Sequence, residues 1–236
     1  MILTCQAGCR SGCSCVRREK GMYNTVIFDF DGTLADTGEG VFGGVRYALK
    51  CLGEPVPDME TLKKFIGPPL EASFSQECGL SSDRCAEAVN KYREYYSQTG
   101  IFELRFYDSA VSTLEALKKR GVKIGVGSSK PEIFLNRILE KFQLDRYFDC
   151  VAGAVIGRPH ADKIGIINDA LKRLGASDKN SVLMVGDRKF DIEGAHGAGI
   201  KCAGVLEGGY GTREELENAG ADYVVETLAD ILDIVK

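Results

Sequence analysis

The 236-residue sequence has no long apolar run and no marked excess of either charge. No segment approaches the roughly 20 apolar residues that a membrane-spanning helix needs, and the start of the chain lacks the apolar core of a signal peptide. Its 30 basic and 34 acidic residues leave a formal net charge of −4, and nothing in that balance indicates a nucleic-acid or anionic-membrane partner. We therefore expect a soluble cytoplasmic protein, monomeric or homodimeric, that binds neither nucleic acid nor a membrane.

The nine cysteines are odd in number, and none are paired with the CxxC spacing of common zinc sites. Residues 1–21 show no apolar period, so we expect a disordered or non-native leader ahead of a start at Met22. Metal binding by this leader is the alternative, through Cys5, Cys9, Cys13 and Cys15. We expect the remaining five to be reduced, buried thiols: Cys51, Cys78, Cys85, Cys150 and Cys202.

From Thr25 onward, short β-rich runs alternate with helical patterns, which is typical of a parallel sheet covered on both faces. The fold class that this predicts is α/β, with a Rossmann-like three-layer core and a small all-helical addition. We predict strands at 25–30, 123–128, 150–154, 182–186, 201–205 and 222–225.

Two helices between these strands have clear ends. The first covers 109–121, where Gly121 stands at the position of a C-terminal cap. The second covers 130–142, where Pro131 suits the first helical position. Its predicted apolar stripe comprises Phe134, Ile138 and Phe142.

Residues 38–104 interrupt the alternation with several helical stretches and no convincing strand. We therefore predict a helical module of 38–104 inserted into a core domain made of 22–37 and 105–236. Gly67, Pro68 and Pro69 should end a helix of this module and form a rigid turn near the cleft or, alternatively, simply pack the module.

Four acidic residues follow two of the predicted strands. In "VIFDFDGTLADT", Asp29 and Asp31 come at the carboxyl end of the first strand, where ligands bind in open α/β sheets. Asp187 ends the strand in "VLMVGD", and Asp191 falls one turn into the next helix. Two like charges about 4 Å apart repel by roughly 4 kcal/mol at an effective dielectric constant near 20, so a cation is needed. Carboxylate oxygens suit Mg²⁺.

A predicted anion site accompanies the acids. Ser128 and Ser129 in "VGSSKP" end the second strand, where hydroxyls and the N–H groups of a helix start can hold an anion. Lys163 begins a later helix and can place an ammonium at the same point. An anion site beside a metal and a carboxylate nucleophile fits phosphoryl transfer to aspartate. There is no GxxxxGK[ST] loop, so a P-loop nucleotide hydrolase is not predicted.

Each of these residues could instead have a purely structural role. Asp187 and Asp191 could cap a helix and occupy its first turn, the serines could be loop residues, and Lys163 could be solvated. The joint pattern, in this order and at successive strand ends, favours the chemical interpretation.

"DFDGTLADT", "VGSSKP", Lys163 and "GDRKFD" resemble, in order, the four motifs of the haloacid dehalogenase superfamily, over residues 22–236. "FIGPPLEASF" and the helical insertion are similar to the phosphoglycolate phosphatase-like members. The resemblance implies that Asp29 is a nucleophile and that Asp31 protonates the leaving group and later activates water. An acid at position 31 argues against the dehalogenase branch, because a halide needs no proton.

The same resemblance implies a Mg²⁺ ion held by the Asp29 side chain, the Asp31 backbone carbonyl and Asp187, with Asp191 in support. Ser128, Ser129 and Lys163 would bind the phosphoryl group, while the helical cap closes over a small phosphorylated metabolite. Many relatives carry the lysine of the third motif in a "KP" pair, whereas this chain has Arg158 there, so Arg158 is an alternative to Lys163.

The implied function is a Mg²⁺-dependent phosphatase acting through an aspartyl phosphate on a phosphoglycolate-like compound, a nucleoside monophosphate, a sugar phosphate or pyrophosphate. A phosphomutase of the same fold and a non-catalytic phosphate-binding protein are the alternatives.

Overall fold

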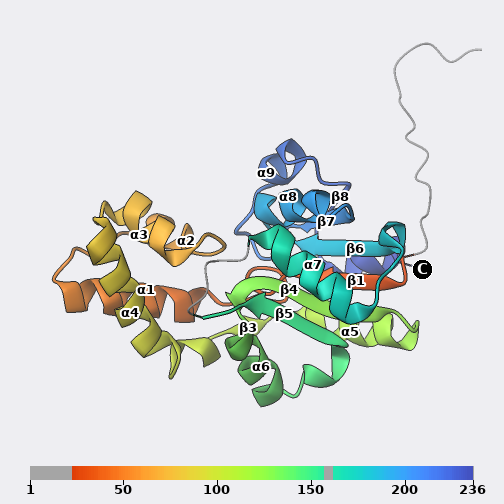
Figure 1. Cartoon of the computed structure of the whole chain (residues 1–236), viewed down its shortest axis with the longest axis horizontal. Coiled ribbons are helices and arrows are strands. Elements are labelled where there is room, and N and C mark those ends of the chain that lie inside the picture. The colour runs from red at the N-terminus through yellow and green to blue at the C-terminus, as the bar shows by residue number, and fades with distance from the viewer. Residues whose placement is uncertain (1–22, 157–161, 236) are drawn as a thin grey trace, which may run out of the picture.

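The computed structural model describes residues 23–156 and 162–235, and its centre is a six-stranded parallel sheet (Figure 1). The strand order is β5-β4-β1-β6-β7-β8, so the first strand lies in the middle. The α/β class predicted from the sequence is confirmed. The strands are β1 (Thr25–Phe28), β4 (Lys123–Pro131), β5 (Cys150–Ala154), β6 (Val182–Gly186), β7 (Lys201–Val205) and β8 (Tyr223–Val225).

Three strand ends differ from the prediction. β1 stops at Phe28, because the Phe30 carbonyl accepts bonds from the N–H groups of Leu34 and Ala35 and so closes a turn. β8 begins one residue later than expected. β4 continues past 128 to Pro131, with an irregular register. This extension lies against Gly153, where a Cβ atom would stand 2.6 Å from the Lys130 carbonyl oxygen.

Helices cover both faces of the sheet. Val26 and Phe28 share one apolar core with α5 (Asp108–Lys119), α6 (Glu132–Lys141) and α10 (Ile231–Ile234). Ile27 faces the other core, with α7 (Lys163–Leu174), α8 (Lys189–Gly197) and α9 (Arg213–Asn218). Each such side chain contributes roughly 1.5–3 kcal/mol when fully buried, so a one-residue slip of β1 is strongly disfavoured. The position of the residues after β1 is fixed accordingly.

The segment 38–104, which we call the helical segment, lies between β2 (Ala35–Asp36) and β3 (Arg105–Phe106), two short antiparallel strands. Its α-helices are α1 (Gly38–Leu52), α2 (Met59–Lys63), α3 (Leu70–Cys78) and α4 (Ser82–Tyr96), grouped to one side of the sheet (Figure 1). Gly44 lets α1 approach α4, since a Cβ there would lie 2.6 Å from the Tyr92 ring. The domain boundaries at 37/38 and 104/105 remain a proposal.

The ends of the two predicted helices differ in part from the expectation. Gly121 has φ +73° directly after α5 and its C-cap residue, as its predicted capping role requires. Pro131 is not in α6 but ends β4, and the helix begins at Glu132. Phe142 lies beyond the helix end and is 38% exposed, so it is not the third member of a buried stripe. The 3-10 helices are η1 (Gly100–Phe102), η2 (Asp145–Tyr147), η3 (Lys179–Ser181) and η4 (Leu228–Asp230).

All five cysteines of the described residues are free, but only Cys85, Cys150 and Cys202 are buried. Cys51 is exposed and Cys78 half-buried, so the prediction of buried thiols is wrong for these two. The predicted leader of residues 1–21 and its four cysteines lie outside the described residues. Within 23–156 and 162–235, no helix has the length and apolarity needed to span a membrane.

Candidate active site

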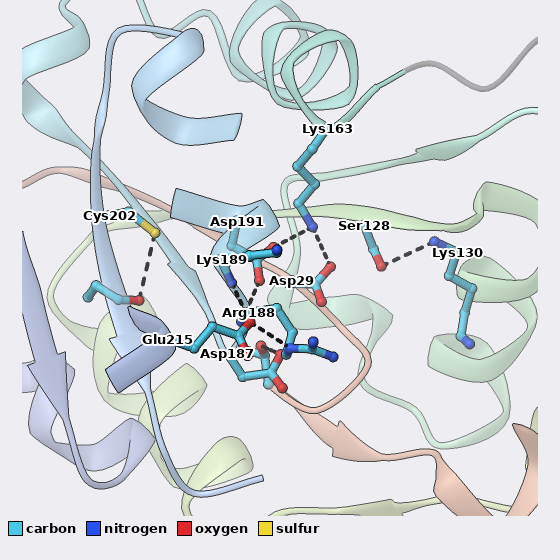
Figure 2. A network of polar contacts seen from close by, with 12 residues as sticks. Asp29, Ser128, Lys130, Lys163, Asp187, Arg188, Lys189, Asp191, Cys202 and Glu215 are labelled. Atoms are coloured by element: carbon cyan, nitrogen blue, oxygen red, sulfur yellow. Dashed lines mark hydrogen bonds and ion pairs between the residues drawn. The ribbon is translucent and has the colours of Figure 1, made fainter. Parts of the chain in front are cut away.

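Most of the predicted site residues lie at the carboxyl edge of three neighbouring strands. β1 pairs with β4 on one side and with β6 on the other. Asp29 follows β1 and still donates its N–H to the Val185 carbonyl of β6, 2.8 Å away. Ser128 lies in β4 and Asp187 directly follows β6, so these residues flank Asp29 from opposite sides (Figure 2). This edge is where open parallel sheets bind ligands.

Lys163 reaches Asp29 from the start of α7. The Asp162 side chain caps this helix by accepting from the Gly165 N–H at 2.8 Å. The Lys163 Nζ lies 2.7 Å from Asp29 Oδ1 and 2.6 Å from Asp191 Oδ1 (Figure 2). Gly194 on α8 makes room for the lysine stem, because a Cβ there would lie 2.6 Å from Lys163 Cγ. Lys163 therefore shares one positive charge between two carboxylates from distant parts of the sequence.

The two carboxylate oxygens of Asp191 have different partners. Its Oδ2 accepts from the Arg188 N–H at 3.0 Å, at the start of α8, while its Oδ1 pairs with Lys163. Asp191 is therefore the first-turn acid of the alternative interpretation, which does not exclude a place in the cluster. The N-cap residue is Arg188, so the interpretation of Asp187 as the helix cap is wrong.

Asp187 is fully buried and only partly hydrogen-bonded. Its Oδ1 accepts from the Thr33 hydroxyl at 3.1 Å, and its Oδ2 has no hydrogen-bond partner among the described residues. A buried acceptor without a partner costs about 1–3 kcal/mol, more for a charged group. Burial and the nearby charges of Asp191 and Asp29 hold the pKa of Asp187 well above its ordinary value.

These carboxylates fit a divalent cation. Asp29, Asp187 and Asp191 each offer an oxygen, and the three oxygens lie within 4.8 Å of one another. Burial raises the pKa of Asp29 to about 6; the Lys163 charge lowers it, whereas Asp191 and Asp31 raise it. Hard oxygen donors and an excess of buried negative charge are what Mg²⁺ or a similar ion would stabilise.

The Asp31 carboxylate is not part of this group of three. It pairs with Lys130, whose Nζ lies 2.8 Å from Asp31 Oδ1 in an ion pair that is not aligned as a hydrogen bond. Lys130 also donates to the Tyr96 hydroxyl at 2.6 Å. Sequence reasoning missed both residues. Lys130 belongs to "VGSSKP" and was predicted only as the first residue of the helix 130–142. The sequence pattern of α4 does not distinguish Tyr96 from Tyr92 or Tyr95.

The two serines occupy different environments. Ser128 is 1% exposed and its Oγ accepts from the Lys130 N–H at 3.3 Å. Ser129 is exposed, on the alternate side of the strand. The expectation that both serines stand at a helix start is wrong, because β4 runs on to Pro131. Phosphate binding by Ser128 and Ser129 stays a prediction.

Arg188, also missed, connects the site to the helical segment. Its guanidinium donates to the Ile66 carbonyl at 2.8 Å and to Glu215 at 2.9 Å. Gly67, with φ +104°, lies beside it, so the predicted turn at Gly67–Pro69 does face the site edge. The turn connects α2 to α3 and does not directly end α2, which stops at Lys63. Arg158, the alternative to Lys163, lies outside the described residues.

Comparisons with known proteins agree with this geometry. The model of the family "Haloacid dehalogenase-like hydrolase" matches residues 26–205. A 5'-nucleotidase of Pseudomonas aeruginosa is 37% identical over 214 residues, 91% of this chain and 96% of that protein. Tyrosine-protein kinase PtkA of Mycobacterium tuberculosis is 33% identical over 199 residues, 84% of this chain and 67% of that protein.

A solved structure has the same fold. The crystal structure of a predicted phosphatase from Clostridium acetobutylicum superposes with a TM-score of 0.84 at 36% identity, covering 90% of this chain and 97% of that one. The strand-end carboxylates and Lys163 occur together within the matched residues. The chain therefore belongs to the haloacid dehalogenase-like hydrolase family, as a phosphatase of that family.

Proposed function

We propose that this phosphatase hydrolyses a small phosphomonoester through a covalent phosphate on Asp29, with Mg²⁺ bound at the carboxylates. The observation that carries the proposal is the pairing of Lys163 with Asp29 Oδ1 next to Asp187 and Asp191. It leaves Asp29 Oδ2 without a lysine partner, beside a cluster that favours a cation.

In the first step, Asp29 Oδ2 attacks phosphorus, and the bond between phosphorus and the leaving oxygen breaks. Asp31 gives its proton to that oxygen, so that an alcohol leaves. Lys163 and Ser128 bind the phosphoryl oxygens, and the Lys163 charge opposes the repulsion between carboxylate and phosphate. Near neutral pH, a pKa of about 6 still leaves most Asp29 ionised and able to attack.

In the second step, water attacks phosphorus and Asp31 takes its proton. The bond between phosphorus and Asp29 breaks, which restores the carboxylate and releases inorganic phosphate. Asp29, the Asp31 backbone carbonyl and Asp187 would hold the Mg²⁺, with Asp191 in support. When bound, the ion supplies positive charge that favours bringing the phosphate dianion to the carboxylates.

The substrate to test first is a nucleoside 5'-monophosphate, because the relative at 37% identity is named a 5'-nucleotidase. Phosphoglycolate, sugar phosphates and pyrophosphate complete the panel. A cytoplasmic location and a monomeric or homodimeric state belong to the same proposal.

The test compares the Asp29→Asn and Asp29→Ala variants with wild type in Mg²⁺, using p-nitrophenyl phosphate and the panel. Both should release no phosphate; the alanine variant guards against deamidation of asparagine back to aspartate. Asp169→Asn, on the exposed side of α7, is the matched control and should keep full activity. Phosphate release by Asp29→Ala would overturn the proposal. Because one relative is named a tyrosine kinase, the assay also follows labelled phosphate, which should appear in solution and not on protein tyrosine.

A further inference from the structure

Lys130 places a buried ammonium between the second aspartate of the site and the helical segment. Its side chain is only 5% exposed, with Asp31 Oδ1 2.8 Å away and the Tyr96 hydroxyl 2.6 Å away. The ammonium also lies 5.0 Å from the centre of the Tyr96 ring. An unpaired buried ammonium is strongly unfavourable, so Asp31 and Tyr96 are the groups that stabilise it there.

We propose that Lys130 is a positioning residue that holds the Asp31 carboxylate against the leaving group, and that Tyr96 of the helical segment holds Lys130. The inference rests on the proposed function, in which Asp31 protonates the leaving oxygen. It adds that the placement of this acid depends on a residue of the helical segment.

The backbone of Lys130 is fixed on both sides. Its N–H donates to Ser128 Oγ, and its carbonyl lies against Gly153 of β5, where any side chain would collide with it. Pro131, the next residue, aligns with Ala154 after the irregular register of β4. The side chain of Lys130 therefore starts from a defined point, and its ammonium has little freedom to leave Asp31.

Tyr96 is fixed equally well. It is the last residue of α4, and its ring stacks on Tyr92 with centroids 5.0 Å apart and packs edge-on against Phe134 of α6 at 5.8 Å. The residue after it, Ser97, accepts from Arg137 of α6 at 2.7 Å. The end of α4 is thus joined to the core helix α6 beside Lys130, so a movement of α4 would change the partners of the ammonium.

The two aspartates have separate lysines. Lys163 pairs with Asp29 and Asp191, whereas Lys130 pairs with Asp31 alone. Removing Lys130 should therefore impair proton donation to the leaving group by Asp31 and leave the attack by Asp29 unchanged. A loss that depends on the leaving group is the signature of this role, since a good leaving group needs little proton donation.

The experiment measures kcat/KM in Mg²⁺ for two substrates, 2,4-dinitrophenyl phosphate and an alkyl phosphate. For Lys130→Met, we expect kcat/KM to fall at least about tenfold more for the alkyl substrate than for the aryl substrate. A positioned acid contributes roughly 100-fold or more to the rate, and only the alkyl substrate depends strongly on it. Tyr96→Phe removes only the hydroxyl and should show the same preference more weakly. Tyr92→Phe is the matched control one turn earlier on α4 and should change neither value.

Equal losses on both substrates, no loss in either variant, or the same preference in Tyr92→Phe would overturn the inference. Circular dichroism and the melting temperature show whether Lys130→Met folds; if it does not, Tyr96→Phe decides. Failure here is distinct from failure of the proposed function: if Asp29→Ala is inactive while Lys130→Met slows both substrates equally, only the role of Lys130 is wrong.

Discussion

The Lys163 ammonium lies 2.7 Å from the Asp29 carboxylate, although 134 residues separate the two along the chain. It also contacts Asp191, so one buried cation is shared between two buried anions. Asp187 adds a third acid nearby, which leaves the cluster with more negative than positive charge among the described residues. Burial, with the charges of Asp191 and Asp31 adding to it, raises the pKa of Asp29 to about 6. The excess of negative charge fits a divalent cation.

Replacing Lys163 should damage both activity and stability. Lys163→Met leaves Asp29 and Asp191 without their shared cation, and breaking such a buried pair costs about 3–5 kcal/mol. We expect kcat/KM to fall at least about 100-fold, as loss of a charged group that stabilises the transition state does. Steady-state kinetics and calorimetric melting would measure the two effects. Lys172→Met, at the exposed end of the same helix, is the control and should change little.

Arg158→Ala separates the two candidates for the third motif. If Lys163 has the predicted role, this variant keeps most activity. Abolished turnover in Arg158→Ala together with normal turnover in Lys163→Met would show that the assignment to Lys163 is wrong.

Asp187→Asn should stabilise the metal-free protein. The change removes a buried charge whose Oδ2 has no partner among the described residues, and the asparagine oxygen can still accept from Thr33. In EDTA at pH 8 we expect about 1 kcal/mol of added stability, or roughly 2–4 °C in melting temperature for a chain of this size. Added Mg²⁺ should raise the melting temperature of wild type but not of the variant. A Mg²⁺-dependent rise of equal size in Asp187→Asn would exclude Asp187 from the metal site.

The stability of the metal-free protein should fall as pH rises through the acidic range. The pKa of Asp29 is raised from 3.8 to about 6 on folding, so the folded state binds a proton more tightly than the unfolded state. Its contribution is fully present below pH 3.8 and is lost as pH rises through about 6. At one pKa unit per 1.36 kcal/mol, the loss is about 3 kcal/mol.

Urea unfolding in EDTA at pH 5 and pH 8 would measure about half of this loss, because the rest is already lost below pH 5, with Asp29→Asn as the comparison. The variant should gain stability over wild type at pH 8 and gain less at pH 5. A difference between wild type and variant that does not change with pH would contradict the prediction.

Gly32→Ala should reduce activity and should destabilise the protein by more than the backbone strain at its positive φ alone. Gly32 has φ +81°, and a Cβ there would lie 2.3 Å from Asp187 Oδ2. Gly79 has a similar φ of +67° with no atom within 4 Å, so Gly79→Ala carries the backbone strain alone. We expect Gly79→Ala to lose about 1 kcal/mol and keep its activity, whereas Gly32→Ala loses more stability and most activity. Urea unfolding and phosphate release distinguish the two; equal effects would mean that the contact with Asp187 is unimportant.

Much of this architecture follows from local sequence. Runs such as 182–186 and 201–205 were predicted with their observed bounds, because apolar β-rich residues between turn residues specify buried strands. Asp29 and Asp187 were predicted as neighbours because acids that end parallel strands meet at one sheet edge. The errors lie where tertiary contacts override local preference: β4 extends past Ser128 along Gly153, and Pro131 therefore ends a strand and does not begin a helix.

The sequence by itself determined the fold class, the family resemblance and the acids Asp29, Asp31, Asp187 and Asp191, since each is encoded within a few residues of a strand end. The tertiary structure alone decided which cation serves which acid. Lys163 forms ion pairs with Asp29 and Asp191. Lys130 forms an ion pair with Asp31 and donates a hydrogen bond to Tyr96. These pairings join residues from α4, β4 and α7, and long side chains reach across such distances without leaving any periodic trace in the sequence. For that reason the dependence of Asp31 on the helical segment could be inferred only after the chain was folded.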